Sequence, residues 1–148
     1  GAWVARRYDL LRMQLQAPEI SPFELAITEE GRYLLPNGDR LVVLLSSVSE
    51  PGIDIVEFST ESISFPLTVR SVQPGDRFQP SGMDGHQRLK NYFIDKKIPR
   101  EVRRQTPVVC AGSSILWLVG ERRCEGFWPD ADRPVLQIRL ERAVFVDE

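Results

Sequence analysis

The sequence is poor in the side chains on which most catalytic and metal sites depend. Among 148 residues it has one histidine, His86, and two cysteines, Cys110 and Cys124. Structural zinc normally takes four ligands, and a catalytic triad needs a well-placed histidine, so both kinds of site are disfavoured. Two cysteines do not make a disulfide framework either, and free thiols in a reducing compartment are expected.

Long apolar runs and nucleotide-binding glycine loops are also missing. The longest apolar stretches, 41–45 and 115–119, are far shorter than the roughly 20 residues of a membrane helix. Neither G-x-x-x-x-G-K-[ST] nor G-x-G-x-x-G occurs, and no secretory leader is recognisable. We therefore expect a cytoplasmic protein without membrane contact. The start at Gly1-Ala2, without Met, predicts either a piece of a longer chain or a chain from which a tag has been cleaved.

The net charge of −2 conceals an uneven distribution. Residues 1–65 carry five basic against ten acidic groups, residues 66–107 nine against four, and residues 108–148 five against seven. The middle segment therefore has a net charge of +5. Such an excess of positive charge is typical of a face that binds a polyanion. A basic surface that only contacts solvent would have the same net charge, so charge alone does not distinguish the two interpretations.

Alternating apolar residues and turn signals predict a β-rich chain. Strands are expected over 8–15, 23–28, 32–35, 40–45, 53–58, 67–71, 115–119 and 135–140. Asn37-Gly38 predicts a type I′ hairpin turn, and Gln73–Asp76, with Gly75 third, predicts a type II turn. The polar stretch 59–65 and the change of charge sign there predict a boundary between a β-rich segment, 1–60, and a C-terminal domain, 61–148.

Two short helices are predicted in the basic segment. The first runs from His86 to about Lys97, with Asp84 as N-cap and Gln87 completing a capping box. Pro99 ends it and opens the second, from Arg100 to about Gln105.

The first predicted helix has an apolar side and a basic side. Helical spacing directs Leu89, Tyr92 and Phe93 into the core and places Lys90 and Lys97 on one flank. The expected fold class is α+β and β-rich, with sandwich-like strands and two short helices inserted together.

Three other places in the sequence have side chains that could form a site. Ser81, Asp84 and His86 have the residue types of a triad but lie too close together in sequence, so a hydrolase is disfavoured. The loop 130–132 has two carboxylates, for which a solvated turn is preferred to a metal site. Trp128 offers either a stacking surface or a core side chain. No catalytic or metal-binding residue is predicted.

The remaining cluster is basic. Its members are Arg77, Lys90, Lys97, Arg100, Arg103 and Arg104, with His86 and Lys96 as two further candidates. Arginine forks and lysine charges suit phosphate contacts. Since no helix-turn-helix or zinc-finger pattern is present, structured RNA is a better match than sequence-read DNA.

Several motifs occur in an ordered series. They are 66–71 (Pro-Leu-Thr-Val-Arg-Ser), 74–83 (Pro-Gly-Asp-Arg-Phe-Gln-Pro-Ser-Gly-Met), 89–99 with its basic residues, the Pro-x-x-x-Arg-x-x-x-Pro segment 99–107, and 115–122 around Trp117. Over residues 56–140 this series resembles the C-terminal domain of bacterial tRNA(Ile)-lysidine synthetases, the TilS family. Residues 1–55 share only their β-rich character with the variable segment that precedes this domain in the family.

The resemblance implies a parent enzyme that uses ATP to join lysine to the wobble cytidine of tRNA(Ile). ATP and magnesium are expected in an N-terminal catalytic domain, whose Ser-Gly-Gly-x-Asp-Ser loop does not occur in this chain. The present chain is therefore expected to bind no cofactor and to be inactive alone. Its implied partners are the acceptor stem of tRNA(Ile) and the catalytic domain of its own parent. Its implied fold is similar to a domain of phenylalanyl-tRNA synthetase β chains (PheT).

The resemblance also assigns positions. Arg77, Lys90, Lys97 and Arg103 match basic positions of the family, and Gly75, Asp76, Gly82 and Pro99 match its turns. The chain departs from the family at Glu101, where an aromatic residue is frequent, and at His86, where lysine is frequent. The alternative is a non-enzymatic protein-interaction module whose acidic first half docks on a partner and whose basic face makes contacts within the parent.

Overall fold

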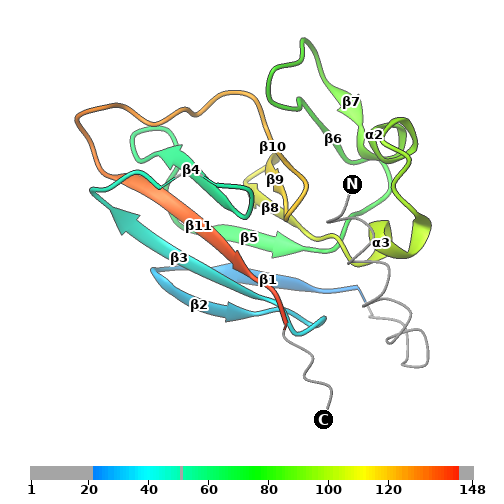
Figure 1. The fold of residues 1–148 in the computed structure, drawn as a ribbon, viewed down its shortest axis with the longest axis horizontal. Coiled ribbons are helices and arrows are strands. Elements are labelled where there is room, and N and C mark those ends of the chain that lie inside the picture. Colours follow the sequence, from blue (N-terminus) through cyan, green and yellow to red (C-terminus); the bar gives the residue numbers. More distant parts are fainter. Residues whose placement is uncertain (1–21, 51, 144–148) are drawn as a thin grey trace.

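Two antiparallel β-sheets face each other over a shared core in the computed structural model (Figure 1). The structure describes residues 22–50 and 52–143, so the strand expected over 8–15 lies outside the described residues. One sheet has the order β1 (Glu24–Ile27), β5 (Leu67–Arg70), β8 (Val108–Ala111), β9 (Ser114–Leu118), β10 (Arg122–Arg123). The other has the order β2 (Gly31–Leu34), β3 (Arg40–Ser46), β11 (Val135–Glu141), β4 (Ile55–Ser59). Two helices, α2 (Leu89–Asp95) and α3 (Arg100–Arg104), follow the small hairpin of β6 (Arg77–Phe78) and β7 (Gln87–Arg88).

The alternation that predicted the strands also builds the core. Leu41 and Val43 on β3 and Leu67 and Val69 on β5 are at most 1% exposed, while their strand neighbours are more accessible. Trp117 on β9 is also buried, at 1% exposed. The β-rich α+β class with two inserted helices is confirmed. The likeness to PheT stays a prediction.

Strands from both sides of the predicted boundary at residue 60 share each sheet. β1 pairs with β5, and β11 lies between β3 and β4. The division into 1–60 and 61–148 stays a prediction. In the described chain, neither sheet is built from one of these parts alone.

The turn between β2 and β3 differs from the predicted type I′. Only Gly38 has a positive φ, 92°, whereas type I′ requires one at Asn37 as well. The Gly38 amide donates to the Leu35 carbonyl at 2.9 Å, with Pro36 second in the turn. Proline fixes φ near −65° and so favours a type I-like geometry with glycine at its end.

The first helix begins later than predicted. Gln87 and Arg88 form β7, opposite Phe78 and Arg77, and α2 starts at Leu89 without a side-chain cap. Asp84 is therefore not an N-cap, and Gln87 is not part of a capping box. The Leu89 amide instead donates to the Asp76 carbonyl at 2.9 Å, so a tertiary contact replaces the local cap.

The second helix agrees with its prediction, except that Pro99 is the N-cap rather than the first helical residue. Leu89, Tyr92 and Phe93 are 1–3% exposed, which confirms the predicted apolar side of α2.

One arginine joins the sheets at their open edge. Arg123 on β10 donates from Nη1 to two carbonyl oxygens of the following loop (2.7 and 3.1 Å) and from Nη2 to the Glu57 carbonyl on β4 (3.1 Å). Its guanidinium carbon lies 4.6 Å from the Phe58 ring centroid and 3.7 Å from that of Trp128. Burial lowers the pKa of Arg123, although an arginine remains protonated in proteins. Edge strands β4 and β10 are thus tied to each other through a side chain.

A carboxylate is buried on the same edge strand. Glu57 is 7% exposed and accepts hydrogen bonds from the Ser49 hydroxyl, the Glu50 amide (2.8 Å) and the Gln137 side-chain amide (3.0 Å). Burial by itself raises the pKa of Glu57. The hydrogen bonds outweigh it and hold the pKa below its ordinary value.

Replacing Glu57 by Gln is expected to flatten the acid dependence of stability. Because the folded-state pKa lies below the unfolded one, the ionised carboxylate stabilises the fold fully above about pH 4.3, and this contribution is lost as the pH falls through the folded-state value. At neutral pH the variant should be about 1–2 kcal/mol less stable, because a hydrogen-bonded buried charge is removed. Urea unfolding over a pH series measures both effects. If the free energy of unfolding depends on pH in the same way in wild type and variant, the lowered pKa of Glu57 is wrong.

Candidate nucleic-acid interface

The basic segment forms one end of the molecule, where the β6–β7 hairpin, α2 and α3 lie together beside the sheets (Figure 1). Aromatic packing anchors this end. The ring centroids of Phe78 and Tyr92 are 5.4 Å apart at 84°, an edge-to-face contact, and Tyr92 packs in the same manner on Phe93.

A turn residue links this end to the first sheet. Asp76 accepts two hydrogen bonds from the Arg70 guanidinium on β5, at 2.9 and 3.0 Å, and one from the Gln73 amide at 2.7 Å. The Asp76 amide donates to the Gln73 carbonyl, and Gly75 has a φ of 86°, so the predicted type II turn is confirmed. The hydrogen bonds to Asp76 raise the pKa of Arg70, and this pair fixes where β6 and α2 begin.

Two other predicted turn positions also lie at bends of the backbone. Gly82, with a φ of 78°, lies in the turn closed by the Met83 amide and the Pro80 carbonyl, and its own amide donates to Glu125 at 2.8 Å. The Pro99 carbonyl accepts from the Arg103 amide at 3.0 Å and so starts α3.

Most of the predicted basic residues are accessible on this end. The exposed side chains are Arg77, Lys90, Lys96, Lys97, Arg100 and Arg104, together with His86, whereas Arg103 is only partly accessible. Within residues 22–50 and 52–143, Arg77, Lys90, Lys97 and Arg100 form no ion pair. Their charges are therefore available to a ligand rather than neutralised by ion pairs within the described chain.

Two of these residues do not sit where the sequence placed them. Lys97 follows α2 in a left-handed conformation, φ 55°, so helical spacing does not put it on one flank with Lys90. His86 precedes β7 and is not helical. Lys96 lies beside the apolar side of α2, with its Nζ 6.0 Å from the Tyr92 ring centroid.

Sequence reasoning missed Arg88 as a member of this surface. In the β6–β7 hairpin Arg88 lies directly opposite Arg77, and both are exposed. Like charges facing each other across a strand pair are destabilising by themselves. A hairpin of two-residue strands has no readable period, so only the pairing itself reveals this arginine pair.

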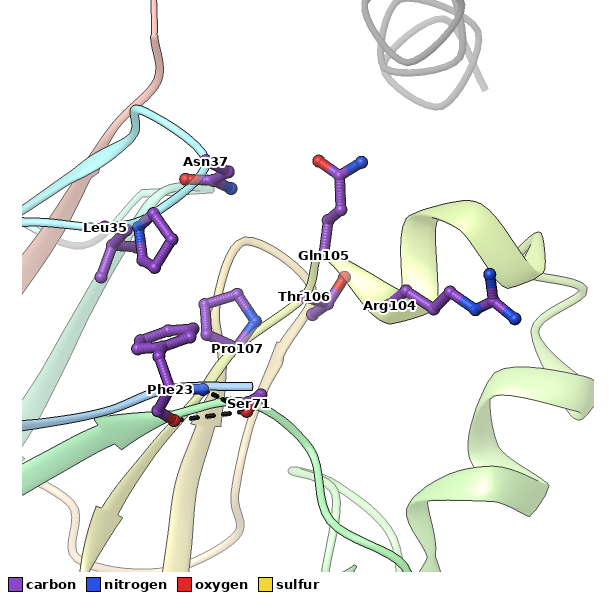
Figure 2. Close-up of a pocket in the computed structure, with 9 residues that line it drawn as sticks. Phe23, Leu35, Asn37, Ser71, Arg104, Gln105, Thr106 and Pro107 are labelled. Atoms are coloured by element: carbon purple, nitrogen blue, oxygen red, sulfur yellow. Dashed lines mark hydrogen bonds between the residues drawn. The ribbon is translucent and has the colours of Figure 1, made fainter. Parts of the chain in front are cut away.

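A narrow groove lies where α3 ends, between the β2–β3 turn and the start of β8 (Figure 2). Asn37 and Gln105 flank its mouth, and the Arg104 side chain extends away from it. At its base the Ser71 hydroxyl bridges the amide and carbonyl of Phe23 at 3.0 and 3.2 Å. Its volume of about 20 Å³ is enough for a water molecule and too small for a nucleotide.

The cysteines, the metal candidates and Ser81 have the following surroundings in the part of the chain described. Cys110 and Cys124 are buried free thiols, and burial raises the pKa of both. No cluster of three metal-ligating side chains occurs among the described residues. The Ser81 hydroxyl accepts from Arg122 Nε at 3.1 Å.

No helix in the described ranges is both long and apolar enough to cross a bilayer.

With this geometry established, comparison with known proteins identifies the family. The family model for the TilS substrate C-terminal domain matches residues 67–140, from β5 to β11. The chain belongs to this family. Its TilS domain thus contains the basic end, the Asp76 turn and the whole first sheet except β1.

Curated relatives and a solved structure agree with this membership. The tRNA(Ile)-lysidine synthase of Geobacter sulfurreducens is 36% identical over 127 residues, which is 82% of this chain and 27% of the relative. That of Caldanaerobacter subterraneus is 44% identical over 91 residues, or 60% and 20%. A crystal structure of a TilS C-terminal domain superposes with a TM-score of 0.66 at 27% identity, covering 80% of this chain and 97% of the other. The chain therefore spans about a quarter of the length of the curated relatives it matches.

Proposed function

We propose that this chain is the tRNA-binding part of a tRNA(Ile)-lysidine synthase and holds the acceptor stem on the end formed by β6–β7, α2 and α3. The observation that carries the proposal is the set of exposed basic side chains without internal ion pairs on that end. The opposed Arg77 and Arg88 support it, because a polyanion supplies the counter-charge that the protein does not.

The mechanism we propose is positional. Phosphates of the acceptor stem contact Arg77, Lys90, Lys97 and Arg100, while the anticodon loop reaches the catalytic domain of the longer protein. Holding the substrate in a productive orientation lowers the barrier of a step without bond-making by the holder. ATP and magnesium belong, in this proposal, to that catalytic domain, and the present chain is inactive alone.

A salt titration tests the proposal with a minor isoleucine tRNA and, beside it, an elongator methionine tRNA that shares its anticodon-loop sequence. If these four side chains each neutralise one phosphate, the plot of log affinity against log salt should have a slope of about −4. Tighter binding of the isoleucine tRNA would support recognition of its acceptor stem. Equal affinity for both tRNAs with the same steep salt dependence would limit the role to non-specific binding of a polyanion. Absence of binding at low salt would contradict the proposal and favour the interaction-module alternative.

A further inference from the structure

A wide cleft opens on the side of the sandwich where edge strands β4 and β10 approach each other. Its volume is about 500 Å³, within the range of about 300–1,000 Å³ typical of small-molecule sites. Trp117, Trp128 and Arg122 contribute to its lining, as does Ile53, which is 86% exposed. Trp117 is buried, so Trp128 and Ile53 supply the exposed apolar surface of the cleft, and exposed apolar surface in a concave site is typical of a binding face.

The cleft has a cation-backed aromatic platform. Arg123 lies 3.7 Å from the centroid of the Trp128 ring, and the indole is still 51% exposed. The Trp128 Nε1–H donates to Glu125 at 2.6 Å, which fixes the ring orientation. An indole held rigid, supported by a guanidinium and open to solvent suits the stacking of a flat, electron-rich ring.

The charges in the cleft favour a nucleotide over a plain aromatic ligand. In residues 22–50 and 52–143 neither Arg122 nor Arg123 has an ion pair, and their hydrogen bonds go to hydroxyl and carbonyl oxygens. The carboxylates of Glu57 and Glu121 also line the cleft, and Glu125 interacts electrostatically with Arg123. A phosphate is therefore best placed at Arg122, which is partly exposed and has no carboxylate partner among the described residues.

The cleft is physically continuous with the basic end. Glu125, which holds Trp128, also accepts from the Gly82 amide in the β6–β7 connection, and Arg122 donates to the Ser81 hydroxyl and carbonyl. The connection that joins the two strands bearing Arg77 and Arg88 is therefore pinned to the rim of the cleft.

We propose that this cleft binds an unpaired nucleotide of the bound RNA, its base stacked on Trp128, which Arg123 supports, and its phosphate beside Arg122. The proposal extends the proposed function, on which it rests, from the paired stem to the single-stranded part of the same RNA. Stacking on an aromatic side chain tolerates any base, so the cleft contributes affinity rather than sequence choice.

The test compares two RNA hairpins, one blunt and one with a short unpaired 3′ extension, binding to the 148-residue chain. In wild type the extension should strengthen binding about tenfold, a size that stacking of one base supplies. Trp128→Ala should remove this gain and leave the affinity for the blunt hairpin unchanged. Trp128→Phe, which keeps a ring, should retain most of it. Thermal melting of each variant identifies a loss of binding caused by unfolding.

A second readout separates this proposal from the proposed function. A short single-stranded oligonucleotide alone should quench indole fluorescence in wild type and not in Trp128→Phe. If the oligonucleotide quenches the fluorescence of wild type but neither hairpin binds, the cleft proposal is supported and the proposed binding of the acceptor stem is contradicted. Three outcomes would each overturn the cleft proposal. Wild type could bind the blunt and the extended hairpin equally well, or a folded Trp128→Ala protein could keep the full gain in affinity from the extension. The third is that the oligonucleotide does not quench the indole fluorescence of wild type.

Discussion

Reversing the charge of Lys90 and Lys97 together is expected to weaken tRNA binding about 100-fold while leaving the fold intact. Both side chains are exposed and without ion pairs in the described structure, so each Glu substitution removes a phosphate contact and adds repulsion. A charge-assisted hydrogen bond contributes about 1.5–3 kcal/mol, and two losses at the low end of this range, where solvent-exposed charges fall, give an effect of about this size. Fluorescence anisotropy at fixed salt measures the affinity, and the salt slope should become shallower by about two.

The matched control makes the same change in net charge elsewhere. Arg32→Glu with Arg133→Glu alters exposed arginines on β2 and in the loop before β11, away from α2 and α3 (Figure 1). Arg133 forms only a surface ion pair with Glu61, worth little by itself. If the control variant loses as much affinity as the Lys90/Lys97 variant, binding depends on net charge, and the assigned surface is wrong.

Replacing Arg123 by Ala is expected to destabilise the fold by about 3 kcal/mol. The change removes three hydrogen bonds to carbonyl oxygens and the stacking on Phe58 and Trp128, and it leaves a buried acceptor on β4 without its donor. In a domain of this size the melting temperature should fall by roughly 10 °C. Thermal and urea unfolding measure the change.

Two further variants define which property of Arg123 matters. Arg123→Lys keeps the charge but cannot reach three carbonyls from one planar fork, so it should recover less than half of the loss. Arg133→Ala removes an arginine from a surface ion pair and should change stability by less than about 1 kcal/mol. An Arg123→Ala protein as stable as Arg133→Ala would show that the two sheet edges do not depend on this contact.

The longer strands were predictable from two signals. On β3 and β5, buried and more accessible side chains alternate, while β9 and β11 are longer, nearly continuous buried runs, and all four strands follow the expected ranges closely. β8 was not expected, because Val108-Val109-Cys110 is a short apolar run without alternation. β6 and β7 have two residues each and so show no period, and the residues of β7 were placed within the expected first helix.

Charge counting located the basic end, but not its geometry. The excess in 66–107 pointed to the segment that carries the exposed side chains. The opposition of Arg77 and Arg88 depends on a strand pairing, and the contact from Arg123 to Glu57 joins residues 66 positions apart. Neither leaves a local trace in the sequence, because each arises only when distant segments meet in the folded chain.

The central position of β11 has a consequence for the order of folding. This strand is the last element described along the chain, yet it lies between β3 and β4 and contributes most of the pairing that holds the second sheet together. During synthesis β2 and β3 can pair as a hairpin, but β4 has no partner strand in this sheet until β11 has left the ribosome. Pairings between such distant segments form slowly, and the intermediate that lacks β11 exposes an unpaired strand edge, which favours aggregation. Completion of the second sheet thus depends on the synthesis of β11.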